Sequence, residues 1–230
     1  MLPLTDNVPT RTFPLVTVLL ITANVAVWLF YQLPDLDRSA ADLAYQPCEV
    51  NNSCPPGTAT GEDWPITAVT SMFMHGGWLH LAGNMLFLWI FGNNVEDAMG
   101  KIRFLIFYLL SGFAATVLQT VVTLATADGA GTAIPNLGAS GAVSGVLGAY
   151  LLLLPTASVL TIVFYFLVEV PAFLFLGFWF LFQLWLGGVS LTAPQEGGGV
   201  AFFAHIGGFA FGMLTVYLFA AGRRPLRPSY

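Results

Sequence analysis

Long apolar stretches separated by shorter polar segments dominate the pattern of this chain. Six of them approach the roughly 17 to 25 residues that a helix needs to cross the hydrocarbon core of a bilayer. They lie at about 13–33, 77–94, 103–125, 139–154, 171–189 and 200–220. The pattern predicts an all-α polytopic membrane protein built as a bundle of six transmembrane helices.

The fourth stretch is the shortest, and the segment that follows it leaves the number of spans open. Residues 140–154 make a full span only if flanking residues contribute. Residues 156–170 are also apolar, but Pro155, Glu169 and Pro171 interrupt them. We expect an interfacial or short helical connector there, and the alternative is a seventh span.

Composition favours a membrane protein and excludes a nucleic-acid-binding one. Hydrophobic residues make up 57% of the chain and charged residues 8%, and the mean hydropathy is +0.77. These values are far from those of an ordinary soluble domain. The net charge is −5 and the seven basic residues are scattered, so the chain has no basic surface for nucleic acid.

The distribution of basic residues predicts the orientation in the membrane. With six spans, only Arg38 lies on one side. The other side carries Arg11, Lys101, Arg103, Arg223, Arg224 and Arg227. Basic loops stay in the cytoplasm, so we expect a cytoplasmic tail at 1–12, a membrane domain at 13–220 and a cytoplasmic tail at 221–230. No cleavage site follows the first span, which therefore stays as an anchor. The compact form suggests a bacterial inner membrane.

The loop at about 34–65 is expected on the opposite, extracytoplasmic side. It is acidic and contains both cysteines of the chain, Cys48 and Cys54, in CEVNNSC. A pair so close in sequence on that side favours a disulfide over a metal site, which would need further ligands nearby. We therefore predict no metal site.

Polar side chains gather near the outer ends of three predicted spans. Ser140 begins the fourth, His80 and Asn84 share one face of the second at spacing i, i+4, and His205 lies in the first turns of the sixth. His75 stands at the entrance of the second span. Polar groups inside a bilayer are rare and usually mark a functional site.

Small residues predict that the fourth and sixth spans pack closely. Gly141 and Gly145, and likewise Gly208 and Gly212, have the spacing that lets two helices approach. Ser144 is interpreted as another small packing residue. Such a contact would bring Ser140 within hydrogen-bond reach of a histidine one turn before Gly208.

These groups match the requirements of a serine hydrolase. A neutral histidine, with an unperturbed pKa of about 6.5, can take the proton of a serine hydroxyl and make it a nucleophile. Acyl transfer also needs donors for the oxyanion. His80, Asn84 and the backbone N–H of Ser140 at a helix start can supply them.

Three motifs together resemble the rhomboid family of intramembrane serine proteases. They are HGGWLHLAGN at 75–84, GASG at 138–141 and AHIGGFAFG at 204–212, in the family's order, and the similarity runs from about 66 to 220. The resemblance implies a rhomboid-like six-span fold and cleavage of membrane-anchored proteins in or near their transmembrane helix, without a metal or organic cofactor. The resemblance implies that Ser140 is the nucleophile and His205 the general base. It places His80 and Asn84 on the oxyanion side, which Gly138 helps to shape, and it gives His75 a less direct role.

Other segments depart from the family or match it only loosely. Many members carry a Trp-Arg pair in the first loop, where this chain has Ile66-Thr67. The aromatic stretch 171–189 is expected to face lipid, and only the resemblance makes it a lateral gate. Glu96 and Asp97 are interpreted as helix-end structure.

Other classes of function fit less well. A metal-dependent membrane protease lacks its HExxH motif here, and a transporter would be expected to have an inverted repeat. The remaining alternative is a relative that binds transmembrane helices without cutting them. The expected partners are transmembrane protein substrates and the lipid bilayer, and neither nucleic acid nor metal.

Overall fold

The computed structural model describes residues 1–58, 60–192 and 201–222. The helices are α1 (Leu15–Val27), α2 (Leu36–Leu43), α3 (Trp64–Thr70), α4 (Trp78–Phe87), α5 (Asn93–Met99), α6 (Lys101–Thr126), α7 (Ser140–Leu153), α8 (Ala172–Thr192) and α9 (Phe202–Ala220). The π-helical turns are Trp28–Gln32 and Leu88–Gly92, and the 3-10 turns are Pro47–Asn51, Ser71–Phe73 and Gly129–Ala133. The strands are β1 (Leu2–Asp6), β2 (Ser158–Val163) and β3 (Phe166–Pro171).

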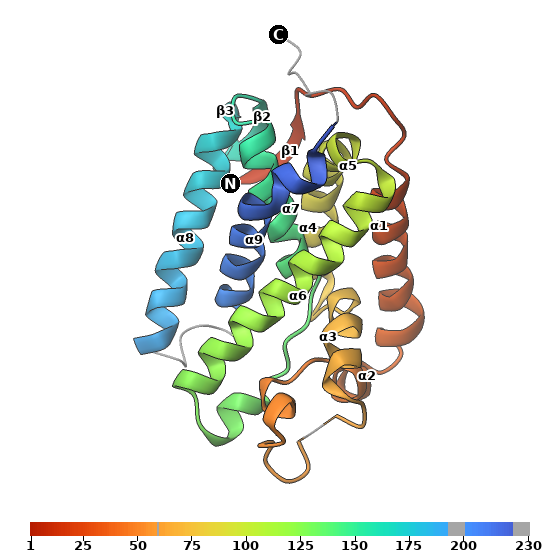
Figure 1. Cartoon of the computed structure of the whole chain (residues 1–230), viewed down its shortest axis with the longest axis vertical. Helices are drawn as coiled ribbons and strands as arrows, with labels where there is room; N and C mark the ends of the chain where they lie inside the picture. Colours follow the sequence, from red (N-terminus) through yellow and green to blue (C-terminus); the bar gives the residue numbers. More distant parts are fainter. Residues whose placement is uncertain (59, 193–200, 223–230) are drawn as a thin grey trace.

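Six helical rods correspond to the six predicted apolar stretches (Figure 1). The π-helical turns extend α1 and join α4 to α5. Within the described part of the chain, four helices are long and apolar enough to cross a membrane, namely Leu15–Gln32, Lys101–Thr126, Ala172–Leu191 and Phe202–Ala220. The predicted helical membrane fold is confirmed, while the count of six spans stays a prediction.

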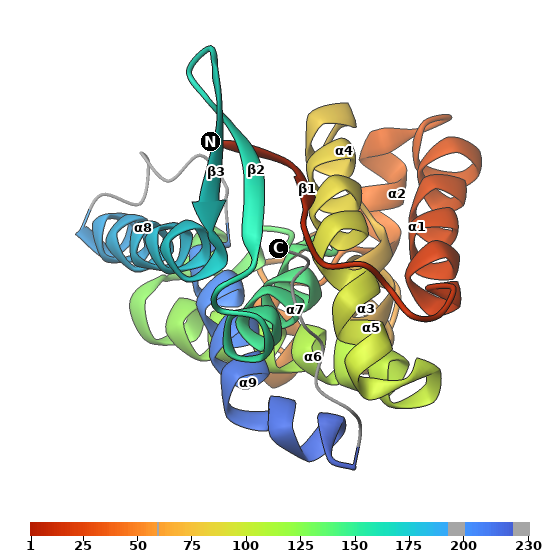
Figure 2. The same cartoon turned by 90° about the horizontal axis from the view of Figure 1, so that it is seen from above.

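The centre of the bundle is α7. It packs against both α6 and α9, with α8 on one flank and α4, α5 and the π-helical turn between them on the other (Figures 1 and 2). Its middle residues Val146, Leu147 and Tyr150 are fully buried. A helix surrounded in this way is buried on all sides, which explains why α7 is apolar all round without an amphipathic pattern.

The connector between α7 and α8 differs from the prediction. Residues 156–170 form neither an interfacial helix nor a seventh span: β2 and β3 make an antiparallel hairpin, and β1 pairs antiparallel with β2. Along β2 the β-branched residues Val159 and Thr161 are buried and their neighbours are partly exposed. This alternation and β-branching are typical of a strand, so the all-α description is corrected by one small sheet.

The amino-terminal segment is built into the fold rather than a free tail. Asp6, at the end of β1, accepts hydrogen bonds from Tyr150 of α7 at 2.6 Å and from Asn94 of α5 at 2.7 Å. Burial outweighs these hydrogen bonds and raises the pKa of Asp6. The predicted tail 1–12 therefore fixes the sheet to the bundle.

Two acidic residues of α5 hold the start of α1. Glu96 is buried and accepts backbone N–H groups of Val16 and Thr17 at 3.0 and 2.8 Å, which satisfies free donors at a helix start. Asp97 pairs with Arg11 at 3.1 Å. Burial opposes ionisation of Asp97, but hydrogen bonds from Arg11 and from a neighbouring threonine outweigh it and lower its pKa.

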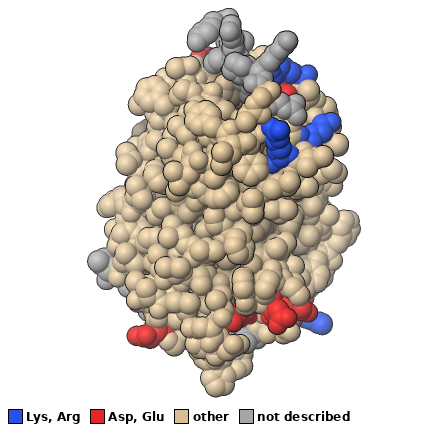
Figure 3. All heavy atoms as spheres, viewed as in Figure 1, with Lys and Arg blue, Asp and Glu red and all other residues tan. Residues whose placement is uncertain are grey.

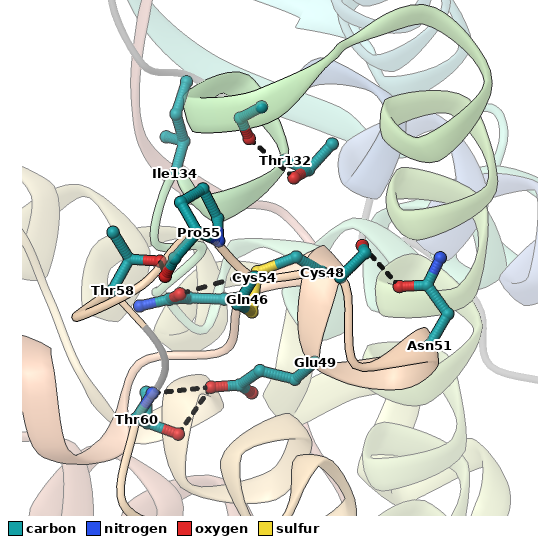
Figure 4. The surroundings of a disulfide bond; sticks show 12 residues. Gln46, Cys48, Glu49, Asn51, Cys54, Pro55, Thr58, Thr60, Thr132 and Ile134 are labelled. Carbon is teal, nitrogen blue, oxygen red and sulfur yellow. Dashed lines mark hydrogen bonds between the residues drawn. A yellow bond between two sulfur atoms is a disulfide. The ribbon is translucent and has the colours of Figure 1, made fainter.

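The loop after α1 is folded and cross-linked. It contains α2 and α3, and Cys48 and Cys54 form a disulfide (Figure 4). Glu49 accepts the backbone N–H of Thr60 at 3.1 Å beside it (Figure 4). The loop is fastened to α6 by a 2.7 Å hydrogen bond between the hydroxyls of Tyr45 and Thr120.

On the face that Figure 3 shows, the charged side chains lie toward the two ends of the molecule. Lysine and arginine side chains gather at the end where α6 starts, with a few acidic atoms among them, and acidic side chains with one basic side chain lie at the opposite end. Arg103 at the start of α6 donates to the carbonyl of Ala221 at 2.8 Å. Arg223, Arg224 and Arg227 lie outside the described residues, so the predicted carboxy-terminal tail is described only to residue 222.

Candidate active site

Ser140 and His205 meet between α7 and α9. Ser140 is the first residue of α7 and His205 lies in the first turn of α9. The Oγ atom of Ser140 is 2.8 Å from Nε2 of His205, which is a good hydrogen-bond distance. A hydroxyl and an imidazole nitrogen thus stand in the geometry of nucleophile and base.

Glycine makes this approach possible. A Cβ atom built on Gly208 would overlap the carbonyl oxygen of Gly141, and one built on Gly212 would overlap that of Gly145. The backbones of the two helices are therefore in direct contact at both levels. The glycines singled out in the sequence face each other across the α7–α9 contact, within two turns of the serine and histidine.

Gly148 was not singled out, yet it makes the same kind of contact. A Cβ there would overlap the carbonyl oxygen of Phe209. Ser144, the residue interpreted as packing, is buried and donates to the carbonyl of Ser140 at 2.6 Å. Its hydroxyl is satisfied within α7 and leaves Ser140 Oγ to the histidine.

Donors gather on the other side of Ser140. The backbone N–H of Gly76 donates to Nδ1 of His80 at 3.3 Å, so a neutral His80 carries its proton on Nε2. That edge faces Gly138, because a Cβ built there would lie 2.8 Å from Nε2 of His80 and 3.5 Å from Ser140 Oγ. Gly138 has a backbone φ of +128°, which residues other than glycine rarely adopt.

Asn84 supplies a second donor. Its Nδ2 is buried and has no hydrogen-bond partner among the described residues. Both Asn84 and His80 line an open cavity of about 960 Å³ that also contains Ser140 and His205. The cavity is bounded by α4, α7, α8, α9 and the segment 135–137. The residues that the sequence predicted near the outer ends of three spans therefore line one cavity.

His75 lies behind this cavity rather than in it. It is buried, and its backbone exchanges two hydrogen bonds with the side chain of Gln32, at 2.8 and 3.0 Å. Its ring packs against that of His80 with centroids 5.2 Å apart. Burial, with a smaller contribution from His80, lowers the pKa of His75 to about 3. His75 is therefore a neutral ring that supports His80 from outside the cavity.

Only part of the surface of α8 is exposed, so the expectation that α8 faces lipid can apply only to that part. Phe178, Leu181 and Trp185 are exposed. Trp179, however, lies against the His205 ring with centroids 5.9 Å apart. Oε1 of Gln183 is 2.9 Å from Nδ1 of His205. The sequence reasoning missed this glutamine, although it is the one polar residue in the apolar stretch 172–189.

Comparison with known proteins assigns the family. A model described as rhomboid domain matches residues 62–222. The chain belongs to the rhomboid family. It is 33% identical over 153 residues to Rhomboid protein 1, mitochondrial, of Saccharomyces cerevisiae, a match that covers 65% of this chain and 40% of the yeast protein.

Two further relatives come from a bacterium and a plant. Putative rhomboid protease YdcA of Bacillus subtilis is 30% identical over 149 residues, covering 64% of this chain and 67% of that protein. RHOMBOID-like protein 1 of Arabidopsis thaliana is 28% identical over 240 residues, covering 95% of this chain and 55% of that protein. The chain spans less than half of the yeast relative and about half of the plant one.

The same comparisons bear on location. With the apolar helices, they identify an integral membrane protein. The relatives are named as mitochondrial proteins as well as bacterial ones, so they do not support the bacterial inner membrane in particular. That compartment and the orientation of the termini stay predictions.

Proposed function

We propose that this rhomboid is an intramembrane serine protease that cuts membrane-anchored proteins with Ser140 and His205. The observation that carries the proposal is the 2.8 Å hydrogen bond between Ser140 Oγ and His205 Nε2, made inside a cavity that also contains His80 and Asn84. Family membership agrees with it, since relatives are named Rhomboid protease GluP and Putative rhomboid protease YdcA.

The chemistry follows from the two side chains. His205 Nε2 takes the hydroxyl proton as Ser140 Oγ attacks the scissile carbonyl carbon. His205 then gives that proton to the leaving amine as the C–N bond breaks, which leaves an acyl ester on Ser140. Water attacks the ester and gives its proton to His205, and the departing Ser140 oxygen takes that proton back.

Three donors stabilise the oxyanion of each tetrahedral intermediate. They are Nε2–H of His80, Nδ2 of Asn84 and the backbone N–H of Ser140, which begins α7 and has no partner within the helix. Removal of one such donor costs about 100- to 1,000-fold in rate in a known protease. No step requires a metal or organic cofactor.

The substrate must present extended backbone to Ser140. A continuous helix keeps its carbonyl groups hydrogen-bonded, so substrate segments with Gly or Pro near their outer end should be cut faster than an uninterrupted leucine helix. Equal rates for the two would contradict this. We further propose that the basic end of the molecule in Figure 3 faces the cytoplasm.

Cleavage in liposomes tests the function. A labelled model transmembrane protein is incubated with the wild type and with Ser140→Ala, His205→Ala and Ser190→Ala. The control residue Ser190 hydrogen-bonds within α8 to Gly187. We expect wild type and Ser190→Ala to cut and the two site variants to be silent.

The opposite outcomes are equally defined. If the site variants cut as fast as the wild type, the assigned nucleophile and base are wrong. If the wild type binds several such substrates and cuts none, the chain is the non-cleaving relative that binds transmembrane helices.

A further inference from the structure

Gln183 lies on the side of α8 that faces α9. On that side Phe180 stacks on Phe209 of α9 with centroids 4.4 Å apart. A Cβ built on Gly187, one turn after Gln183, would lie 3.3 Å from Ile206. Gln183 itself is 7% exposed. Its amide is therefore held between the two helices, away from the lipid-facing side of α8.

A buried amide in this position needs a partner, and it has one in His205. Leaving a polar group unpaired in an apolar environment is costly. Oε1 of Gln183 stands 2.9 Å from Nδ1 of His205, and on the opposite edge of the ring Nε2 meets Ser140 Oγ at 2.8 Å. The three side chains thus form one continuous chain across α8, α9 and α7.

We propose that Gln183 is the positioning residue of His205: its amide oxygen accepts the Nδ1 proton and so fixes the ring in the tautomer whose Nε2 can take the serine proton. An amide oxygen only accepts hydrogen bonds, and a neutral imidazole carries one N–H. The Nδ1–H therefore leaves Nε2 as the acceptor. The proposal deepens the proposed function and rests on it for its kinetic consequences.

The amide suits this position better than a carboxylate. It orients the ring and stabilises Nδ1–H when His205 is protonated, without bringing a formal charge into an apolar helix contact. Since α8 carries Gln183 and α9 carries His205, the base is correctly oriented only while α8 is seated against α9. A segment expected to face lipid thereby contributes to the active site.

The tautomer of His205 is the direct test, and it does not depend on cleavage. The chain has three histidines, so ¹⁵N NMR of histidine-labelled protein can be assigned with His205→Ala. We expect protonated Nδ1 in the wild type at neutral pH and a mixture of tautomers in Gln183→Met. A wild-type ring protonated on Nε2 alone would overturn the proposal.

Kinetics supply the second test. Gln183→Met keeps the volume and loses the acceptor, so kcat should fall about 10- to 100-fold, as expected for a lost hydrogen bond to a charged group, with KM little changed. Gln183→Glu restores an acceptor and should recover most of this loss. Ser190→Ala, elsewhere on α8, is the matched control and should retain wild-type kcat.

The pH profile separates positioning from packing. The carboxylate of Gln183→Glu stabilises the imidazolium, so the base is lost to protonation at higher pH and the acid limb of the rate profile should move upward. Among the described cavity residues His80 is the other ionisable group, and it is unchanged in this variant. A wild-type kcat for Gln183→Met, or a wild-type acid limb for Gln183→Glu, would overturn the proposal.

Two further outcomes have a defined interpretation. If Gln183→Met does not fold, the position of the acid limb in Gln183→Glu alone decides whether Gln183 positions His205. If wild type cuts and Ser140→Ala does not, but Gln183 variants match the wild type, the positioning role fails while the protease stands.

Discussion

Replacing Gly208 with alanine should force α7 and α9 apart and break the hydrogen bond between Ser140 and His205. The new Cβ would overlap the carbonyl oxygen of Gly141 and lie 3.0 Å from its carbonyl carbon. Nonbonded carbon atoms pack at about 3.5–4.0 Å and the overlap with the oxygen is the closer contact, so the helices must separate by about 1 Å. Gly141 follows Ser140, and the 2.8 Å Oγ–Nε2 distance should therefore lengthen to about 3.8 Å, beyond a good hydrogen bond.

Both stability and rate should respond. Overpacking of this kind typically lowers the free energy of unfolding by about 1–3 kcal/mol. Misplacement of reacting groups by about 1 Å can reduce the rate about 100-fold. The assay is thermal unfolding in detergent together with cleavage of a labelled transmembrane substrate in liposomes. Gly177→Ala is the matched control, because a Cβ at Gly177 meets nothing within 4 Å.

The reasoning is refuted if Gly208→Ala unfolds at the wild-type temperature and cleaves at the wild-type rate. A response no different from that of Gly177→Ala would also count against it, since Gly177→Ala does not touch the α7–α9 contact and alanine is more favourable than glycine in a helix interior.

Three further changes test other parts of the structure. Replacing Cys48 and Cys54 with serine removes the disulfide and should lower the free energy of unfolding by about 2–3 kcal/mol in the chain-entropy picture. An unfolding midpoint equal to that of the wild type would contradict this. Asp97→Asn should lower the unfolding midpoint at neutral pH. Because the folded pKa of Asp97 is lowered, the stability difference between wild type and variant is complete above the unfolded pKa of about 3.9 and is lost as the pH falls through the folded pKa. A stability difference independent of pH would argue against the ion pair. Gly138→Ala places a Cβ 2.8 Å from the ring of His80 at a φ that disfavours side chains, so the cleavage rate should fall while substrate binding persists; cleavage at the wild-type rate would show that Gly138 does not shape the oxyanion side.

Much of the helical fold could be predicted from the sequence because a bilayer imposes it. Crossing the hydrocarbon core requires long apolar helices, and α6, α8 and α9 end within a few residues of the predicted spans. The glycine spacing of Gly208 and Gly212 likewise dictates close backbone approach, which brings Ser140 to His205 across the helix contact.

Elements that depend on distant partners were not predictable in the same way. The hairpin at 158–171 has an apolar composition that also suits a helix, and its pairing with β1 joins segments about 160 residues apart. Glu96 looks like an ordinary helix-end residue until α1 brings its free N–H groups to it. Gln183 was overlooked because aromatic neighbours suggested a purely lipid-facing helix, although a lone amide in such a helix signals a partner.

Covalent labelling tests the central claim most directly. A fluorophosphonate reacts with a serine hydroxyl only when a base activates it, and peptide mass spectrometry locates the adduct. Our account predicts an adduct on Ser140 in the wild type and none in His205→Ala, with both proteins folded. An adduct on another serine, or equal labelling of Ser140 without His205, would contradict it.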